Sequence, residues 1–161
     1  REQKLRFVLL GSGDAALENE YRRLEADFPR LCAVRIGYDN SLSHRIEAGS
    51  DFFLMPSRFE PCGLNQMYSM AYGTLPIVRA TGGLADTVVD TNSQTLDAAT
   101  ATGFVFTEPE PAALLATVRR ALALWHDQDS WQHVQHCAMR QDFSWQRSAN
   151  RYLELYNAVI D

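Results

Sequence analysis

The chain has 161 residues, of which 46% are hydrophobic, so we expect one domain across residues 1–161. Its net charge is −5 and both signs are interspersed, which argues against a nucleic-acid or membrane surface as the main partner. The sequence shows no signal peptide and no apolar run of about 18 residues. The three cysteines lack zinc or redox spacing, so we expect reduced thiols in a cytoplasmic protein.

Short apolar runs alternate with amphipathic segments along much of the chain. The runs predict strands over residues 5–10, 31–36, 51–55, 75–79 and 103–106. Helical spacing predicts helices over residues 15–28, 41–48, 65–72, 83–90, 111–126, 130–140 and 145–160. Residues 91–102 are polar and rich in threonine, and we expect a disordered loop there. This order predicts an α/β fold, a Rossmann-like parallel sheet with helices on both faces, followed by a helical segment.

The most informative segment covers residues 53–88, FLMPSRFEPCGLNQMYSMAYGTLPIVRATGGLADTV. It predicts a strand, a turn, a helix, a second strand and a glycine turn that begins another helix. In an open α/β sheet, ligands bind at the carboxyl ends of the strands, where both turns fall. Glycines allow backbone to approach a ligand closely, and free N–H groups bind phosphate. The nearby Glu60 suits hydroxyl groups, so the pattern favours a nucleotide sugar as the ligand.

The same segment resembles the donor site of bacterial glycogen synthases and plant starch synthases. The resemblance extends to LLGSGD at residues 9–14, IGYDNSLSHRIEAGSDFFLMPS at 36–57 and DFSWQ at 142–146. These family 5 enzymes are retaining glucosyltransferases of the GT-B architecture that use ADP-glucose or, less often, UDP-glucose. The resemblance implies the C-terminal, nucleotide-sugar half of such an enzyme, in the cytoplasm or in a plastid. Its reaction transfers glucose from ADP-glucose to the non-reducing end of an α-1,4-glucan, with no cofactor.

The resemblance also implies roles for particular residues. Glu60 is the expected catalytic residue and holds hydroxyls of the transferred glucose, whereas the alternative is a solvated loop carboxylate. Tyr38 stacks on the adenine ring, or is an ordinary loop tyrosine.

The turn into the next helix is expected to bind the donor diphosphate. It consists of Cys62, Gly63, Leu64 and Asn65. Asn65 could equally be a helix N-cap, and Cys62 a small buried residue. The second turn brings Gly82 and Gly83 against the glucose or the diphosphate.

Other polar residues narrow the interpretation. Tyr68 occupies the position at which many GT-B transferases carry a second, ribose-binding glutamate, as expected for the glycogen and starch synthase branch. Arg58 and Arg79 are the local cations, available either to phosphate or to surface ion pairs. His133 and His136 have no acidic partner that would complete a ligand set, so we expect no metal site.

The family's catalytic Arg and Lys, its histidine and its acceptor groove have no counterpart in the sequence. We therefore expect a fragment that lacks its first strand–helix unit and is inactive alone, with an open strand edge. Residues 142–161 resemble the closing helix, which would pack toward the absent N-terminal domain that holds the glucan acceptor.

Two alternative functions remain at this stage. A GT-B transferase with other donor or acceptor specificity, such as a sucrose or trehalose-type synthase, is disfavoured by Tyr68. A non-catalytic dinucleotide-binding or interaction domain is compatible with Gly11, Gly13 and Ala16. The length of the synthase resemblance outweighs that shorter pattern.

Overall fold

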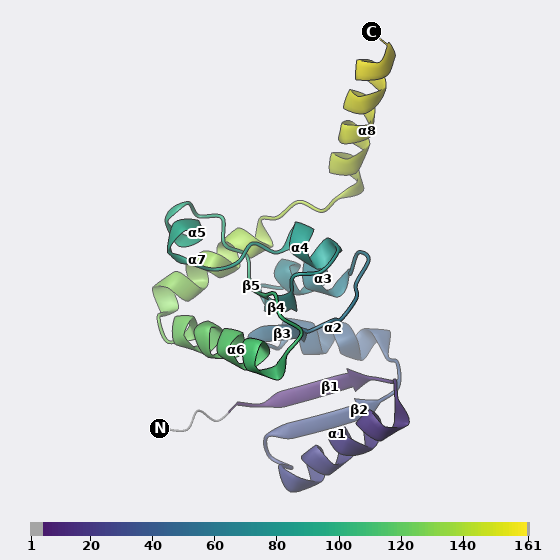
Figure 1. Ribbon diagram of the computed structural model, residues 1–161, viewed down its shortest axis with the longest axis vertical. Coiled ribbons are helices and arrows are strands. Elements are labelled where there is room, and N and C mark those ends of the chain that lie inside the picture. The colour runs from purple at the N-terminus through teal and green to yellow at the C-terminus, as the bar shows by residue number, and fades with distance from the viewer. Residues whose placement is uncertain (1–4, 161) are drawn as a thin grey trace. The chain divides into compact units, whose positions relative to one another are not determined.

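The structure, a computed structural model, describes residues 5–160 and shows an α/β architecture (Figure 1). The strands are β1 (Phe7–Gly11), β2 (Cys32–Ile36), β3 (Phe52–Met55), β4 (Leu75–Arg79) and β5 (Phe104–Phe106). The helices are α1 (Ala15–Asp27), α2 (Asn40–Ala48), α3 (Asn65–Ala71), α4 (Gly83–Thr87), α5 (Ser93–Asp97), α6 (Pro111–Trp125), α7 (Gln128–Met139) and α8 (Trp145–Ile160). Parallel sheets with flanking helices and a helical C-terminal end confirm the predicted fold class.

The chain divides into two compact units, Arg1–Ile46 and Glu47–Asp161. In the first unit β1 and β2 form a parallel pair, and α1 packs against it. The rings of Phe7 and Tyr21 stack with their centroids 6.1 Å apart. Asp14 caps α1 by accepting hydrogen bonds from the backbone N–H groups of Ala16 and Leu17.

The second unit contains a parallel sheet in the order β3-β4-β5. Its central strand β4 has four successive buried residues from Leu75 to Val78, as expected for a parallel strand covered on both faces. Phe52 pairs with Leu75 and Met55 with Val78, so β3 and β4 end at the same edge of the sheet. The turns that follow the two strands are therefore neighbours.

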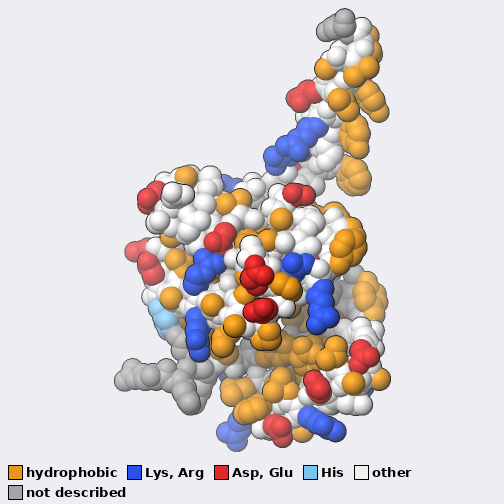
Figure 2. Space-filling view, in the orientation of Figure 1, with side chains coloured by type: hydrophobic (Ala, Val, Ile, Leu, Met, Phe, Trp, Pro, Cys, Tyr) orange, Lys and Arg blue, Asp and Glu red, His pale blue; other side chains and the backbone are white. Residues whose placement is uncertain are grey.

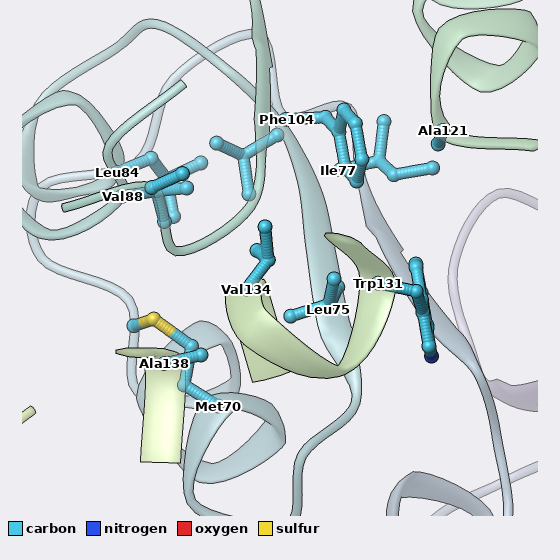
Figure 3. Packing of buried hydrophobic residues seen from close by; sticks show 12 residues of the cluster. Met70, Leu75, Ile77, Leu84, Val88, Phe104, Ala121, Trp131, Val134 and Ala138 are labelled. Atoms are coloured by element: carbon cyan, nitrogen blue, oxygen red, sulfur yellow. The ribbon is translucent and has the colours of Figure 1, made fainter. Parts of the chain in front are cut away.

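One hydrophobic core forms around the β3-β4-β5 sheet. Figure 3 shows side chains from α3, β4, α4, β5, α6 and α7 pointing toward one another. Trp131 of α7 is 3% exposed, and its ring centroid lies 4.9 Å from that of Phe52 in an edge-on arrangement. α7 packs against α3, the helix that follows the turn after β3, so the core supports the start of that helix.

The predicted disordered loop at residues 91–102 is wrong. Helix α5 lies within it and begins with a capping box, in which Asn92 and Thr95 each bond the other's backbone N–H. The Thr95 hydroxyl also donates to the Asp90 carbonyl, and the Thr102 hydroxyl accepts from the N–H of Val89. The threonines satisfy backbone groups, which orders a segment that composition alone suggests is loose.

Differences in the other elements are small shifts of their ends. The largest is in the helix predicted over residues 83–90, which ends at Thr87 because Val88 has extended backbone angles. The Asp90 carboxylate then accepts from the N–H of Val105 at 2.7 Å and pairs with Arg120 at 2.9 Å.

Among the helices in residues 5–160, none combines the length and the apolar character needed to cross a bilayer.

The core can be tested by truncating one of two tryptophans. We expect Trp131→Ala to lower the free energy of unfolding by about 3–5 kcal/mol, because it removes a buried indole and leaves a cavity. Trp145, at 87% exposed, is the matched control when the 161-residue chain is measured by itself, and Trp145→Ala should change little there. Chemical denaturation followed by circular dichroism measures both. Equal losses in the two variants would contradict the assignment of the core.

Candidate functional site

Two turns at the carboxyl edge of the β3-β4-β5 sheet form the candidate site. The first covers residues 56–64, between Met55 at the end of β3 and Asn65 at the start of α3. The second covers residues 80–82, between Arg79 at the end of β4 and Gly83 at the start of α4. The structure thus brings together the predicted site residues of the second unit: Glu60, Cys62, Gly63, Leu64, Asn65, Gly82 and Gly83.

The turns are in direct backbone contact. A Cβ atom on Gly82 would lie 2.0 Å from the Glu60 carbonyl oxygen, and one on Gly83 would lie 2.2 Å from the Cys62 carbonyl oxygen. Gly82 also has a φ of +45°, which side-chain-bearing residues rarely adopt. The N–H of Gly83 donates to the Pro61 carbonyl at 3.2 Å. Glycine is therefore required for the contact, and the Gly83 N–H is already used within the protein.

Arg79 fastens the first turn to the sheet. Its Nε donates to the Ser57 carbonyl at 2.7 Å, and its Nη2 donates to the Arg58 carbonyl. No carboxylate within residues 5–160 pairs with this guanidinium. The guanidinium instead holds the backbone that leads to Glu60.

Several polar groups at the first turn have no partner in the described part of the chain. The half-buried Glu60 carboxylate has no hydrogen bond or ion pair among residues 5–160. The backbone N–H groups of Gly63, Leu64 and Asn65 likewise find no acceptor within those residues. Free N–H donors suit an anion and a free carboxylate suits hydroxyl groups, so both could serve one ligand.

The N-cap alternative for Asn65 is wrong. Leu64 is the N-cap of α3, it makes no side-chain cap bond, and Asn65 is the first helical residue. The Leu64 carbonyl accepts from the N–H groups of Met67 and Tyr68. The expected ligand contact of Asn65 stays a prediction. Cys62 is exposed, so its alternative as a buried residue is also wrong.

Gln66 is a residue of this site that the sequence patterns did not single out. It is fully buried, and its Nε2 donates to the carbonyls of Cys62 at 3.2 Å and Gly63 at 3.0 Å. Nε2 also lies 3.1 Å from the hydroxyl oxygen of Thr87 in α4. Its place in the sequence could have indicated a bonded role. Gln66 shares a helix face with the buried Ser69 and Met70, and a buried polar amide needs hydrogen-bond partners.

The first unit places Tyr38 beside another glycine turn. The N–H of Gly37 donates to the Gly11 carbonyl at 2.9 Å, which joins the ends of β1 and β2. Tyr38 follows directly and is 87% exposed, with its hydroxyl 3.3 Å from Asn40 Oδ1. An exposed ring at this position is free to stack on a ligand.

A cavity of about 230 Å³ opens beside the same turn of the first unit. Its lining includes the apolar residues Leu9, Leu17, Tyr21 and Ile36, together with Asp14 and Glu18. No cluster of His, Cys, Asp and Glu among residues 5–160 has a geometry suited to a metal ion.

Comparisons with known proteins identify relatives along most of the chain. The family model described as "Glycosyl transferases group 1" matches residues 1–133. Glycogen synthase of Hydrogenovibrio crunogenus is 51% identical over 99% of this chain and 32% of its own length. Glycogen synthase of Thioalkalivibrio sulfidiphilus is 54% identical over 96% of this chain and 32% of its own length.

A solved structure agrees with these sequence relatives. The catalytic domain of starch synthase IV from Arabidopsis thaliana, bound to ADP and acarbose, superposes with a TM-score of 0.82. It is 37% identical and covers 95% of this chain, which spans 32% of that structure. The predicted resemblance to glycogen and starch synthases is confirmed. The chain spans about a third of the length of the relatives it matches.

The contact between the turns can be tested at Gly83. We expect Gly83→Ala to lower the free energy of unfolding by about 1–3 kcal/mol, because its Cβ would overlap the Cys62 carbonyl. Gly13→Ala is the matched control, since a Cβ there meets nothing within 4 Å. Denaturant titration of both variants measures the difference. A Gly83→Ala protein as stable as the control would show that the turns do not touch.

Proposed function

Because this chain belongs to the group 1 glycosyl transferase family, we propose that it is the donor-binding part of a cytoplasmic glycogen synthase. The complete enzyme would transfer glucose from ADP-glucose to the non-reducing end of an α-1,4-glucan, with retention of configuration. The relatives that share 51% and 54% identity with the chain carry that enzyme's name. The related starch synthase structure, which binds ADP, supports an adenine nucleotide as the donor.

The observation that carries the proposal is the unpaired polar surface of the first turn. The Glu60 carboxylate and the N–H groups of Gly63 and Leu64 lack partners within residues 5–160. In the proposed complex the N–H groups donate to the diphosphate, and Glu60 accepts from glucose hydroxyls. Tyr38 stacks on adenine, with a contribution of about 1 kcal/mol.

The chemistry that these residues supply is mainly electrostatic. Breaking the bond between glucose and the diphosphate leaves negative charge on the departing oxygen, and preoriented N–H donors stabilise that charge. Glu60, a negative group close to the sugar, orients it through hydroxyls and helps to stabilise positive charge that develops on the ring. Arg79 already uses two of its five N–H donors on backbone carbonyls, so we expect further cations from other parts of the enzyme to help neutralise the diphosphate.

The proposal extends to the parts that bind the glucan acceptor. Helix α8 has no buried residue, and Figure 2 shows hydrophobic side chains gathered along one of its sides. Trp145, Tyr152, Tyr156 and Ile160 are all more than half exposed. An N-terminal domain that packs on this side and carries the acceptor would cover them.

The edges of the two sheets also support a larger complete protein. Within its own unit, each of the apolar strands β1 and β3 has a single partner strand among the described residues. We propose that the complete protein supplies a further strand–helix unit. The one-domain assignment of residues 1–161 stays a prediction.

Calorimetric titration with ADP tests the proposed binding site in the complete protein that contains this sequence. Tyr38→Ala should raise the Kd of ADP about fivefold through lost stacking, while Tyr38→Phe, which keeps the ring, should change it little. Glu60→Ala should leave the Kd of ADP nearly unchanged. It should lower kcat/KM for ADP-glucose about 10- to 100-fold, because bonds from hydroxyls to a charged group are lost.

Two outcomes would overturn the proposal. One is an absence of ADP binding by the wild-type protein while NAD binds, which would favour a dinucleotide-binding domain. The other is undiminished glucose transfer by Glu60→Ala.

Cysteine labelling gives a second test of ligand position. Cys62 is exposed, whereas Cys32 and Cys137 are buried. Burial, and then the Glu25 carboxylate, raise the pKa of the Cys32 thiol, which keeps it protonated and slow to react at neutral pH. We expect iodoacetamide to modify Cys62 first, and saturating ADP to slow that modification at least about fivefold. Peptide mass spectrometry measures the rates, with Cys32 and Cys137 as internal controls. An unchanged Cys62 rate would place the nucleotide elsewhere.

A further inference from the structure

The carbonyls that Gln66 binds belong to two of the three peptide groups whose N–H donors find no acceptor within residues 5–160. The Cys62 carbonyl shares a peptide plane with the N–H of Gly63, and the Gly63 carbonyl shares one with the N–H of Leu64. In a trans peptide the C=O and N–H bonds point in opposite directions. By drawing both carbonyls to its Nε2, the buried Gln66 side chain turns both N–H groups away from itself.

The same amide joins the first turn to the second. Gln66 Nε2 lies 3.1 Å from Thr87 Oγ1, and the Thr87 hydroxyl donates to the Gly83 carbonyl at 2.6 Å. The two amide hydrogens of Gln66 are thus shared among three acceptors, and a continuous series of polar contacts runs from Cys62 and Gly63, through Gln66 and Thr87, to Gly83. It connects segments that the sequence separates by a helix and a strand.

The side-chain oxygen of Gln66 indicates that packing does not explain a glutamine at this position. Gln66 Oε1 is buried and has no hydrogen-bond partner within residues 5–160. It points at Gly63, where a Cβ atom would lie only 2.5 Å away. A buried acceptor without a partner costs stability, and an apolar side chain of similar length would avoid that cost. The amide is explained by what its Nε2 does.

We propose that Gln66 is a positioning residue for the donor diphosphate. Its Nε2 orients the peptide groups that present the N–H donors of Gly63 and Leu64, and Thr87 couples this orientation to the second glycine turn. The inference rests on the proposed function, because it assumes that the diphosphate binds these N–H groups. Gln66 itself does not touch the ligand.

Gln135 of α7 provides a matched control for a purely structural glutamine. Its Nε2 donates to the carbonyl of Gly73 at 2.7 Å, and Gly73, like Gly63, has a positive φ. This bond holds the C-terminal end of α3, away from the turns that present the free N–H groups. Removing it should affect stability without affecting the donor site.

The experiment compares Gln66→Met, Thr87→Val and Gln135→Met in the complete protein that contains this sequence. Calorimetry measures the Kd of ADP, steady-state assays measure KM and kcat for ADP-glucose, and thermal melts measure stability. We expect Gln66→Met to raise the Kd of ADP about tenfold and to lower kcat, since freed peptide groups no longer present their N–H donors. We expect Gln135→Met to lower the melting temperature and leave both Kd and kcat unchanged.

Thr87→Val keeps the bonds from Gln66 to the first turn and removes only the link to Gly83. It should therefore raise the Kd of ADP less, by about two- to threefold. Added to Gln66→Met it should cause little further loss, because the two residues act in one chain of bonds. If Gln66→Met fails to fold, Thr87→Val still provides a test. An unchanged Kd of ADP in Thr87→Val would overturn the proposed coupling of the two turns.

The outcomes separate this inference from the proposed function. Wild-type protein that binds ADP, together with a folded Gln66→Met variant of equal affinity, would overturn the positioning role and leave the donor site intact. Equal losses of affinity in Gln66→Met and Gln135→Met would also overturn it, because the effect would then be general destabilisation. Wild-type protein that fails to bind ADP would overturn both.

Discussion

The close backbone contact between two glycine turns is the constraint on which the candidate site depends. Gly82 and Gly83 lie so near the carbonyls of Glu60 and Cys62 that no side chain fits between them. Within this contact the N–H of Gly83 donates to the Pro61 carbonyl, so it is not available to a ligand. The contact holds the shape of the first turn, in which the Glu60 carboxylate and neighbouring N–H groups have no partner within residues 5–160. The site is built from bonds that leave selected polar groups free.

The parallel register of β3 and β4 makes that contact possible. Because Met55 pairs with Val78, both strands end at one edge and their turns must share the same space. The apolar run of β4 and the core around Trp131 hold the strands, and Arg79 fixes the backbone that follows β3. A substitution that destabilises the core would therefore disturb the register of β3 and β4 and displace the turns, even if every residue that contacts the ligand stays the same.

The sequence predicts local features of this site well and long-range ones poorly. The alternation of apolar runs with helical spacing places the turns after β3 and β4, and the family motif singles out Glu60. Both features can be read within a short window. The roles of Arg79 and Gln66 depend on partners that other segments bring close, so neither composition nor spacing reveals them. The ordered threonines of residues 91–102 were missed for a similar reason, since Thr102 bonds the backbone of Val89.

In the proposed glycogen synthase, the distribution of charge at the site favours a catalytic centre to which several segments contribute. A diphosphate leaving group gains most from cations held close to it in a site that excludes water. Here Arg79 is engaged with two backbone carbonyls, and the exposed Arg58 has water as a competing partner. N–H groups can orient a diphosphate, but they supply only partial charges. Donor orientation and charge neutralisation would then reside in different segments, so that the leaving group is stabilised only when they come together around the bound sugar nucleotide.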